Sequence, residues 1–200
     1  MKRAVAGIAV LLLLMSLASA ALADEISDQL KQGMKYYQEG KVSQAIGEIE
    51  FALAQMKQKK ADSLGQIFPA APSGWTAEKS EGQAAGGAMF GGGISATRRY
   101  KNSDRGHVKI QVISDSPLIQ SLGMMLSNPM FLQGGKQGKL VRFKGNKALL
   151  KDQGERAEFQ ALINNKVLLQ VEANRVKNAA QVVQEFADKV DLDKLKELTQ

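Results

Sequence analysis

Apolar residues recur every three or four positions in the first part of the chain and every second position in much of the remainder. The helical spacing covers roughly residues 26–60 and is interrupted at Gly40 and Lys41, which predicts two antiparallel helices joined by a short turn. The apolar helical positions are Ile26, Leu30, Met34, Tyr37, Val42, Ala45, Ile46, Ile49, Leu53 and Met56. The sequence therefore predicts a helical hairpin over residues 24–62.

A Pro-containing interval, residues 63–74, separates this hairpin from the alternating part of the chain and is predicted to be a linker. In residues 107–114, Val108, Ile110 and Val112 fall on one side of a strand and the polar residues on the other. The pattern predicts strands at 75–79, 94–101, 107–114, 140–143, 147–150, 159–163 and 167–171. Two tight turns, at Gly145-Asn146 and Asn164-Asn165, are expected to join the last four strands into hairpins.

Two helices are expected within this second domain, residues 75–200. Ser116 and Pro117 are suited to opening the first helix, which extends to about residue 126. Asn178 is expected to cap the second, which extends to about residue 190 and is followed by a short apolar tail. The predicted fold is α+β: the helical hairpin packs on an antiparallel sheet of about six or seven strands with two covering helices.

Two family resemblances follow from these patterns. Residues 24–62 resemble one tetratricopeptide repeat, whose small and large positions match Gly33, Tyr36, Gly40, Ala45, Ile49 and Ala52. Gln29, Gln32 and Lys57 stand where the repeat usually has Trp, Leu and Pro. Proteins of that family usually bind peptides in a groove formed by several repeats, and one repeat cannot bury its own apolar face. The hairpin must therefore pack on the rest of the chain, a second copy or an external partner.

The second resemblance concerns residues 69–190. The order of strands and helices, together with the entry Pro72-Ser73-Gly74-Trp75 to the first strand, resembles the PsbP-like α/β sandwich of binding and accessory proteins. The same region is similar to exported bacterial proteins, a resemblance that indicates a compartment and no activity.

Residues 1–23 have the organisation of a cleavable secretory signal. Lys2 and Arg3 precede an apolar run over residues 4–15, and Ala21 and Ala23 supply the small residues that signal peptidase requires. The run is too short to span a bilayer comfortably, and the chain has no Cys to carry a lipid anchor. Cleavage would lower the formal net charge from +7 to +5. We therefore expect a periplasmic protein that begins at Asp24 and has no disulfides and no transmembrane segment.

No catalytic, cofactor or metal site is predicted. His107 is the only histidine and lies on the polar side of its strand, without a positioned nucleophile in the sequence. One His and no Cys leave few metal ligands. The Gly-rich segment 82–93 lacks the Lys-Ser/Thr ending of a phosphate-binding loop and is expected to be a loop.

Three groups of residues are candidates for contact with a ligand or partner. Met89 and Phe90 form an apolar tip in the Gly-rich loop, and Met124, Met125, Met130 and Phe131 form an adaptable apolar surface. Arg98, Arg99 and Lys101 begin a basic cluster that could contact an anionic envelope surface or stay simply solvated. Nucleic acid is disfavoured by export and by few aromatic residues.

The expected function is that of a non-enzymatic periplasmic binding or accessory protein, contacting a protein partner or an apolar or anionic ligand. One alternative is a hydrolase that uses the carboxylates of Asp152, Glu155 and Glu158. The other is a structural protein that self-associates through the helical hairpin.

Overall fold

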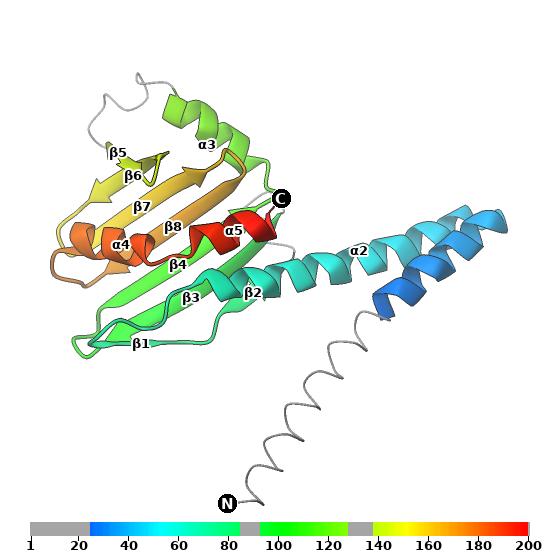
Figure 1. The fold of residues 1–200 in the computed structure, drawn as a ribbon, viewed down its shortest axis with the longest axis horizontal. Helices are drawn as coiled ribbons and strands as arrows, with labels where there is room; N and C mark the ends of the chain where they lie inside the picture. The colour runs from blue at the N-terminus through cyan, green and yellow to red at the C-terminus, as the bar shows by residue number, and fades with distance from the viewer. Residues whose placement is uncertain (1–24, 85–92, 128–137, 200) are drawn as a thin grey trace, which may run out of the picture. The chain divides into compact units, whose positions relative to one another are not determined.

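A computed structural model describes residues 25–84, 93–127 and 138–199 (Figure 1). The described residues form two compact units, one up to Lys57 and the other from Gln58 onward, with the boundary inside one long helix. The first contains the helical hairpin and the second an antiparallel sheet with helices, so the predicted α+β class is confirmed.

The helical hairpin consists of a helix over residues 25–38 and helix α2, Val42–Leu64. Gly40 closes the first helix with a φ of 75°, a left-handed conformation that glycine adopts without strain. Its N–H donates to Tyr37 O at 3.0 Å and the Lys41 N–H donates to Tyr36 O at 2.9 Å. The helix turn is therefore where the sequence predicts it.

The second unit is built on one eight-stranded sheet with the order β1-β3-β4-β8-β7-β6-β5, in which β2 also pairs with β3. All of the pairings are antiparallel. The strands are β1 (Trp75–Ala77), β2 (Glu81–Gln83), β3 (Ile94–Asn102), β4 (His107–Ser114), β5 (Lys139–Phe143), β6 (Asn146–Asp152), β7 (Arg156–Ile163) and β8 (Val167–Asn174).

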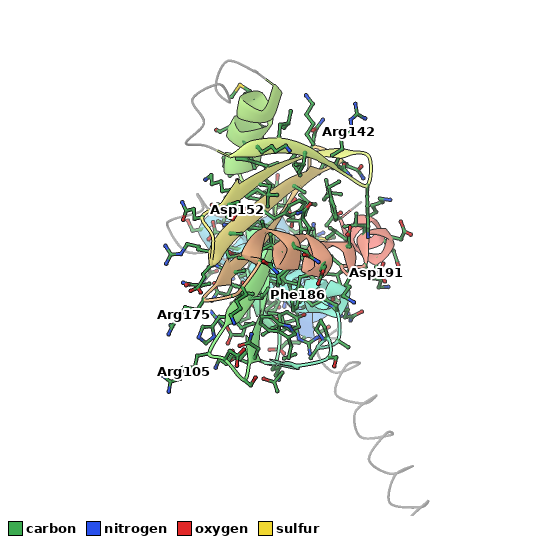
Figure 2. The ribbon with its side chains drawn as sticks, turned by 90° about the vertical axis from the view of Figure 1, so that its left-hand side faces the viewer. Arg105, Arg142, Asp152, Arg175, Phe186 and Asp191 are labelled. Atoms are coloured by element: carbon green, nitrogen blue, oxygen red, sulfur yellow. The ribbon has the colours of Figure 1, made fainter. Side chains whose placement is uncertain are left out.

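One face of the sheet forms the main core with α4 (Ala179–Asp188) and α5 (Leu192–Leu198). Strand alternation places Val108, Ile110 and Val112 on this face, fully buried. Phe186 of α4 packs edge-on against Tyr100 and Trp75, with ring centroids 4.9 and 5.2 Å away. Figure 2 shows Phe186 between the helix and the sheet.

The opposite face carries a smaller apolar cluster under helix α3, Leu118–Ser127. Ile119 of α3 packs with Leu149 of β6 and Leu162 of β7, and these side chains are buried. The helices therefore lie on both faces of the sheet. The same face also carries polar residues, among them Lys109, Glu158, Gln170 and Glu172.

The segment between the two predicted domains differs most from expectation. Residues 63–74 do not form a free linker, because Leu64, Ile67 and Phe68 are buried in the main core. Helix α2 extends to Leu64 and a short 3-10 helix, η1 (Gly65–Ile67), follows. The Pro69 carbonyl then accepts from Tyr100 Oη at 2.8 Å and from Arg98 Nη1 at 3.3 Å. Buried apolar side chains and these hydrogen bonds hold the segment on the sheet.

Smaller differences occur in the turns and at the helix ends. Gly82 and Gln83, expected in a loop, lie in β2. The β5–β6 turn is formed by Lys144 and Gly145, one residue earlier than predicted, because Phe143 pairs with Asn146. The side chain of Asn178 makes no capping hydrogen bond.

The chain end forms a separate helix, α5, in place of the predicted short tail. Its cap is Asp191, which accepts from the Lys194 N–H at 2.9 Å. Both Asn164 and Asn165 do have the positive φ values, 51° and 57°, that the second predicted turn requires.

Candidate functional site

The helical hairpin exposes a row of large apolar side chains. They are between 37 and 68 % exposed, values that are unusual for several large apolar residues on neighbouring turns of a helix. The set consists of Leu30, Met34 and Tyr37 on the first helix and Val42, Ile46, Ile49, Leu53 and Met56 on α2. We call these eight residues the hairpin face.

The hairpin face follows a regular spacing along each helix. Its members on α2 are separated alternately by four and three residues, and those on the first helix continue the same rule. This spacing keeps the side chains in one stripe along a helix and is the spacing that packs two helices side by side. The stripe is therefore suited to receiving another helix.

A different side of each helix makes the contact within the hairpin. Gly33 lies so close to α2 that a Cβ built on it would be 2.9 Å from Ile49 Cγ1 and 3.4 Å from Ala45 O. Ala45 and Ala52 are buried on the same side of α2. Small residues let the two helix backbones approach closely. Ile49 reaches this contact with its Cγ1 while the rest of its side chain stays exposed.

The two stripes point to the same side of the hairpin. With about 100° of rotation per residue, each stripe is centred about a sixth of a turn from the contact made by Gly33 and Ala45, in the same rotational sense along the chain. The helices run in opposite directions, so equal rotations bring both stripes to one side. Phe51, which is also exposed, lies about half a turn away on the other side of α2.

Charged residues surround this face without entering it. At the helix turn, Lys41 Nζ donates to Glu39 Oε2 at 2.8 Å. This hydrogen bond lowers the pKa of Glu39 and raises that of Lys41. On the first helix, Lys31 Nζ lies 3.0 Å from Asp28 Oδ1. All of these groups are exposed, so they favour solubility more than stability.

The basic residues predicted as a contact cluster are divided between the two faces of β3. Arg98 lies on the core side, where its Nε donates to Glu78 O at 3.0 Å and its guanidinium lies over the Tyr100 ring. Arg99 pairs with Glu81 at 3.2 Å, and Lys101 pairs with Glu78. The Lys101 hydrogen bond lowers the pKa of Glu78. All three side chains thus have partners within the protein.

The predicted apolar contacts fall largely outside the described residues. This is true of Met89, Phe90, Met130 and Phe131. Met125 lies in α3. Met124, in the same helix, is exposed. Of this group the structure therefore describes the side chain of Met124 alone.

The three carboxylates considered for a hydrolase do not share a site. Asp152 pairs in register with Ala157 and Glu158 pairs with Lys151, so the two acids lie on opposite faces of the sheet. Asp152 and Glu155 line an open hollow of about 720 Å³ at the end of the sheet. This separation leaves the trio without the geometry that shared acid–base chemistry requires.

Glu158 belongs instead to a polar network on the second face of the sheet. Glu172 is its register partner on β8. Gln170 Nε2 donates to one oxygen of each carboxylate, at 3.0 and 2.7 Å. Lys151 lies 3.3 Å from Glu158, and Lys109 lies 3.0 Å from Glu172. Each acid therefore has a cation beside it, as in a structural charge network.

His107 stands at the start of β4, opposite Lys101 on β3 and Asn174 on β8. In the described part of the chain, no three His, Cys, Asp or Glu side chains come together in an arrangement that could hold a metal ion. Another open hollow, of about 760 Å³, is lined by Ser114, Pro117 and Lys166 among others. Lys60 and Asp115 form a 3.0 Å ion pair at its wall.

Comparison with known proteins assigns no relative. No family model, curated protein or solved structure matches the chain. Within residues 25–84, 93–127 and 138–199, no helix combines the length and apolarity that crossing a membrane requires.

The hairpin face is the feature that the sequence prediction resolved least. All eight of its residues are among the apolar helical positions, but the sequence pattern does not by itself separate exposed from buried members. The sequence does contain a signal that could separate them: the small residues Gly33, Ala45 and Ala52 lie on one side of the helices, and the large apolar residues lie on another.

Proposed function

We propose that the protein is an exported accessory protein of the periplasm that binds another protein chain through the hairpin face and catalyses no reaction. The observation that carries this proposal is the exposure of eight large apolar side chains on one side of the hairpin. Exposing such a surface to water is unfavourable, and a protein partner that covers it gains the corresponding hydrophobic free energy.

Two further features support the proposal. The sequence of residues 1–23 favours export, and the resemblance of residues 24–62 to a tetratricopeptide repeat points to protein binding. Glu158, one of the three carboxylates considered for a hydrolase, forms an ion pair with Lys151. A side chain that is already paired in this way contributes to the sheet and is not free to act on a substrate.

Site-specific photo-crosslinking in cells tests the proposal. A photoreactive amino acid replaces Leu53, in the hairpin face, and in a matched variant replaces Phe51, which has similar exposure on the other side of α2. We expect one discrete crosslinked product, a protein identified by mass spectrometry, from position 53 and none from position 51. The product should disappear when Ile46→Glu is added, because a charge then enters the buried interface.

Two outcomes would overturn the proposal. One is the absence of a product from position 53 and from a second probe at Met34. The other is the same product from position 51. Export is tested separately, by fractionating the cells and sequencing the N-terminus of the protein, which we expect to begin at Asp24.

A further inference from the structure

We infer that the chain covering the hairpin face is a second copy of this protein, so that two hairpins form an antiparallel four-helix bundle. This inference rests on the proposed function and names its partner.

The area of the hairpin face matches that of a standard protein interface. Its eight side chains are on average about half exposed. At about 180 Å² for a fully exposed residue of this size they offer about 700 Å², close to the roughly 800 Å² that each partner buries in a typical stable complex. The largest apolar patch of an ordinary monomer is smaller, about 300–600 Å².

The shape of the face suits a copy of itself. Two antiparallel helices with stripes on the same side form half of a four-helix bundle, and an identical half completes it. The alternating spacing of four and three residues is the one with which helices interlock along such a bundle. A two-fold symmetric dimer also closes on itself and leaves no unsatisfied face to recruit further copies.

Charge at the margins of the face selects one arrangement of the two copies. Gly33 lies level with Ile49 and Glu48, which places Lys31 at about the level of Glu50. Both residues are exposed and lie on the outer margins of the stripes, Lys31 on the first helix and Glu50 on α2. If the two-fold axis runs along the helices, the first helix of each copy lies on α2 of the other, and Lys31 faces Glu50 of the second copy.

The alternative two-fold arrangement places equivalent helices on one another. Lys31 and Glu50 of one copy would then each face the equivalent margin of the other, so the attraction between Lys31 and Glu50 would be absent. The hairpin as a whole opposes self-association little, because residues 24–57 contain six acidic and four basic residues. By contrast, residues 58–200 contain 21 basic and 14 acidic residues, so two sheet units repel each other more than two hairpins do.

Sedimentation of the purified protein, expressed from the full 200-residue sequence, tests the inference. At about 10 µM we expect a dimer for the unmodified protein and a monomer for Leu53→Glu, a change of more than about tenfold in the dissociation constant. Phe51→Glu is the matched control and should remain a dimer. Circular dichroism and Trp75 fluorescence should show that each variant stays folded.

The charge arrangement is tested by a reversal pair. Glu50→Lys should weaken the dimer several-fold, and Lys31→Glu in the same chain should restore it, because the attraction is then present with its sign reversed. Failure of the double variant to recover would overturn the proposed packing of one helix on the other.

The outcomes separate this inference from the proposed function. A monomer at about 100 µM overturns the second copy as partner. If position 53 then still crosslinks to a different protein, the proposed function stands without the dimer. If position 53 crosslinks to nothing, both are overturned. Equal dissociation by Phe51→Glu and Leu53→Glu would also overturn the assignment of the interface to the hairpin face.

Discussion

Gly82 lies where strand β2 meets the end of helix α2, and replacing it tests how tightly the two are joined. A Cβ at this position would lie 2.6 Å from Ala61 C, 2.7 Å from Ala61 O and 2.7 Å from Asp62 N. All three are backbone atoms, so no side-chain rotation relieves the overlap. Gln58 also ties the two elements together: its Nε2 donates to Gly82 O at 3.1 Å, and its Oε1 accepts from the Ala84 N–H at 3.3 Å.

Gly82→Ala should therefore lower the free energy of unfolding of the sheet unit. Overpacking against a rigid neighbour costs about 1–3 kcal/mol. Separation of the two elements would also weaken the Gln58 hydrogen bonds, worth about 1 kcal/mol each. The gain from a less flexible unfolded chain offsets about 0.4–1 kcal/mol of this. We expect a net loss of about 2–3 kcal/mol, which is a decrease of about 1 M in the urea midpoint.

The assay is urea unfolding followed by the fluorescence of Trp75, the only tryptophan of the chain. Trp75 packs on Phe186 with ring centroids 5.2 Å apart and thus reports on the core of the sheet unit. Gly47→Ala is the control: it is helical, a Cβ there meets nothing within 4 Å, and the midpoint should not fall. A Gly82→Ala midpoint equal to or above that of the unmodified protein would refute the reasoning.

Substitutions at three other positions have defined consequences. Burial raises the pKa of Tyr100 from 10.0 to about 12, so the stability that this shift contributes is complete below pH 10 and is lost as the pH rises to 12. In Tyr100→Phe, the free energy of unfolding should therefore depend less on pH in this alkaline range. An unchanged pH dependence would contradict this prediction. Gln29→Leu removes a buried Oε1 that has no hydrogen-bond partner among the described residues and should stabilise the hairpin by about 1 kcal/mol, seen as a higher thermal midpoint by circular dichroism. Asp191→Ala removes the cap on the Lys194 N–H and should cost about 1 kcal/mol in urea unfolding, whereas Asp191→Asn should cost less; equal losses would argue against capping.

Strands with one apolar and one polar side were predictable from the sequence. The expected bounds of β4 agree with the structure, because Val108, Ile110 and Val112 face the core while Lys109 and Gln111 alternate with them. Polar residues marked the opposite side even though Gln111 is itself largely buried. Local alternation is sufficient for such a strand because both of its neighbours are long and regular.

Features created by contacts between distant segments were not predictable in this way. Strand β2 has only three residues and depends on the close approach of Gly82 to Ala61, which no local pattern encodes. Pro69 and Pro72 are typical of a linker, but prolines give no information about the burial of Leu64 and Phe68 beside them. A periodic pattern gives the apolar side of a helix and leaves open what covers it.

The same limit applies to the hairpin face. Helical periodicity correctly predicted two helices and a turn at Gly40, since both depend on residues close in the sequence. It did not predict that Leu30, Ile46 and Leu53 would be exposed, because exposure depends on whatever else packs against the helices. In the structure, the small residues Gly33, Ala45 and Ala52 lie between the two helices of the hairpin, which shows which side of each helix is covered.

The borders of the sheet have a consequence for how many molecules can associate. Strand β5 ends the sheet on one side and carries Lys139 and Arg142 as exposed side chains, with Lys147 opposite Arg142 on β6. The other border is divided between β1 and β2, which have three residues each. Charged or very short border strands are poor templates for adding strands from another molecule. At the high protein concentration of a cell compartment, growth of the sheet into filaments is thereby opposed.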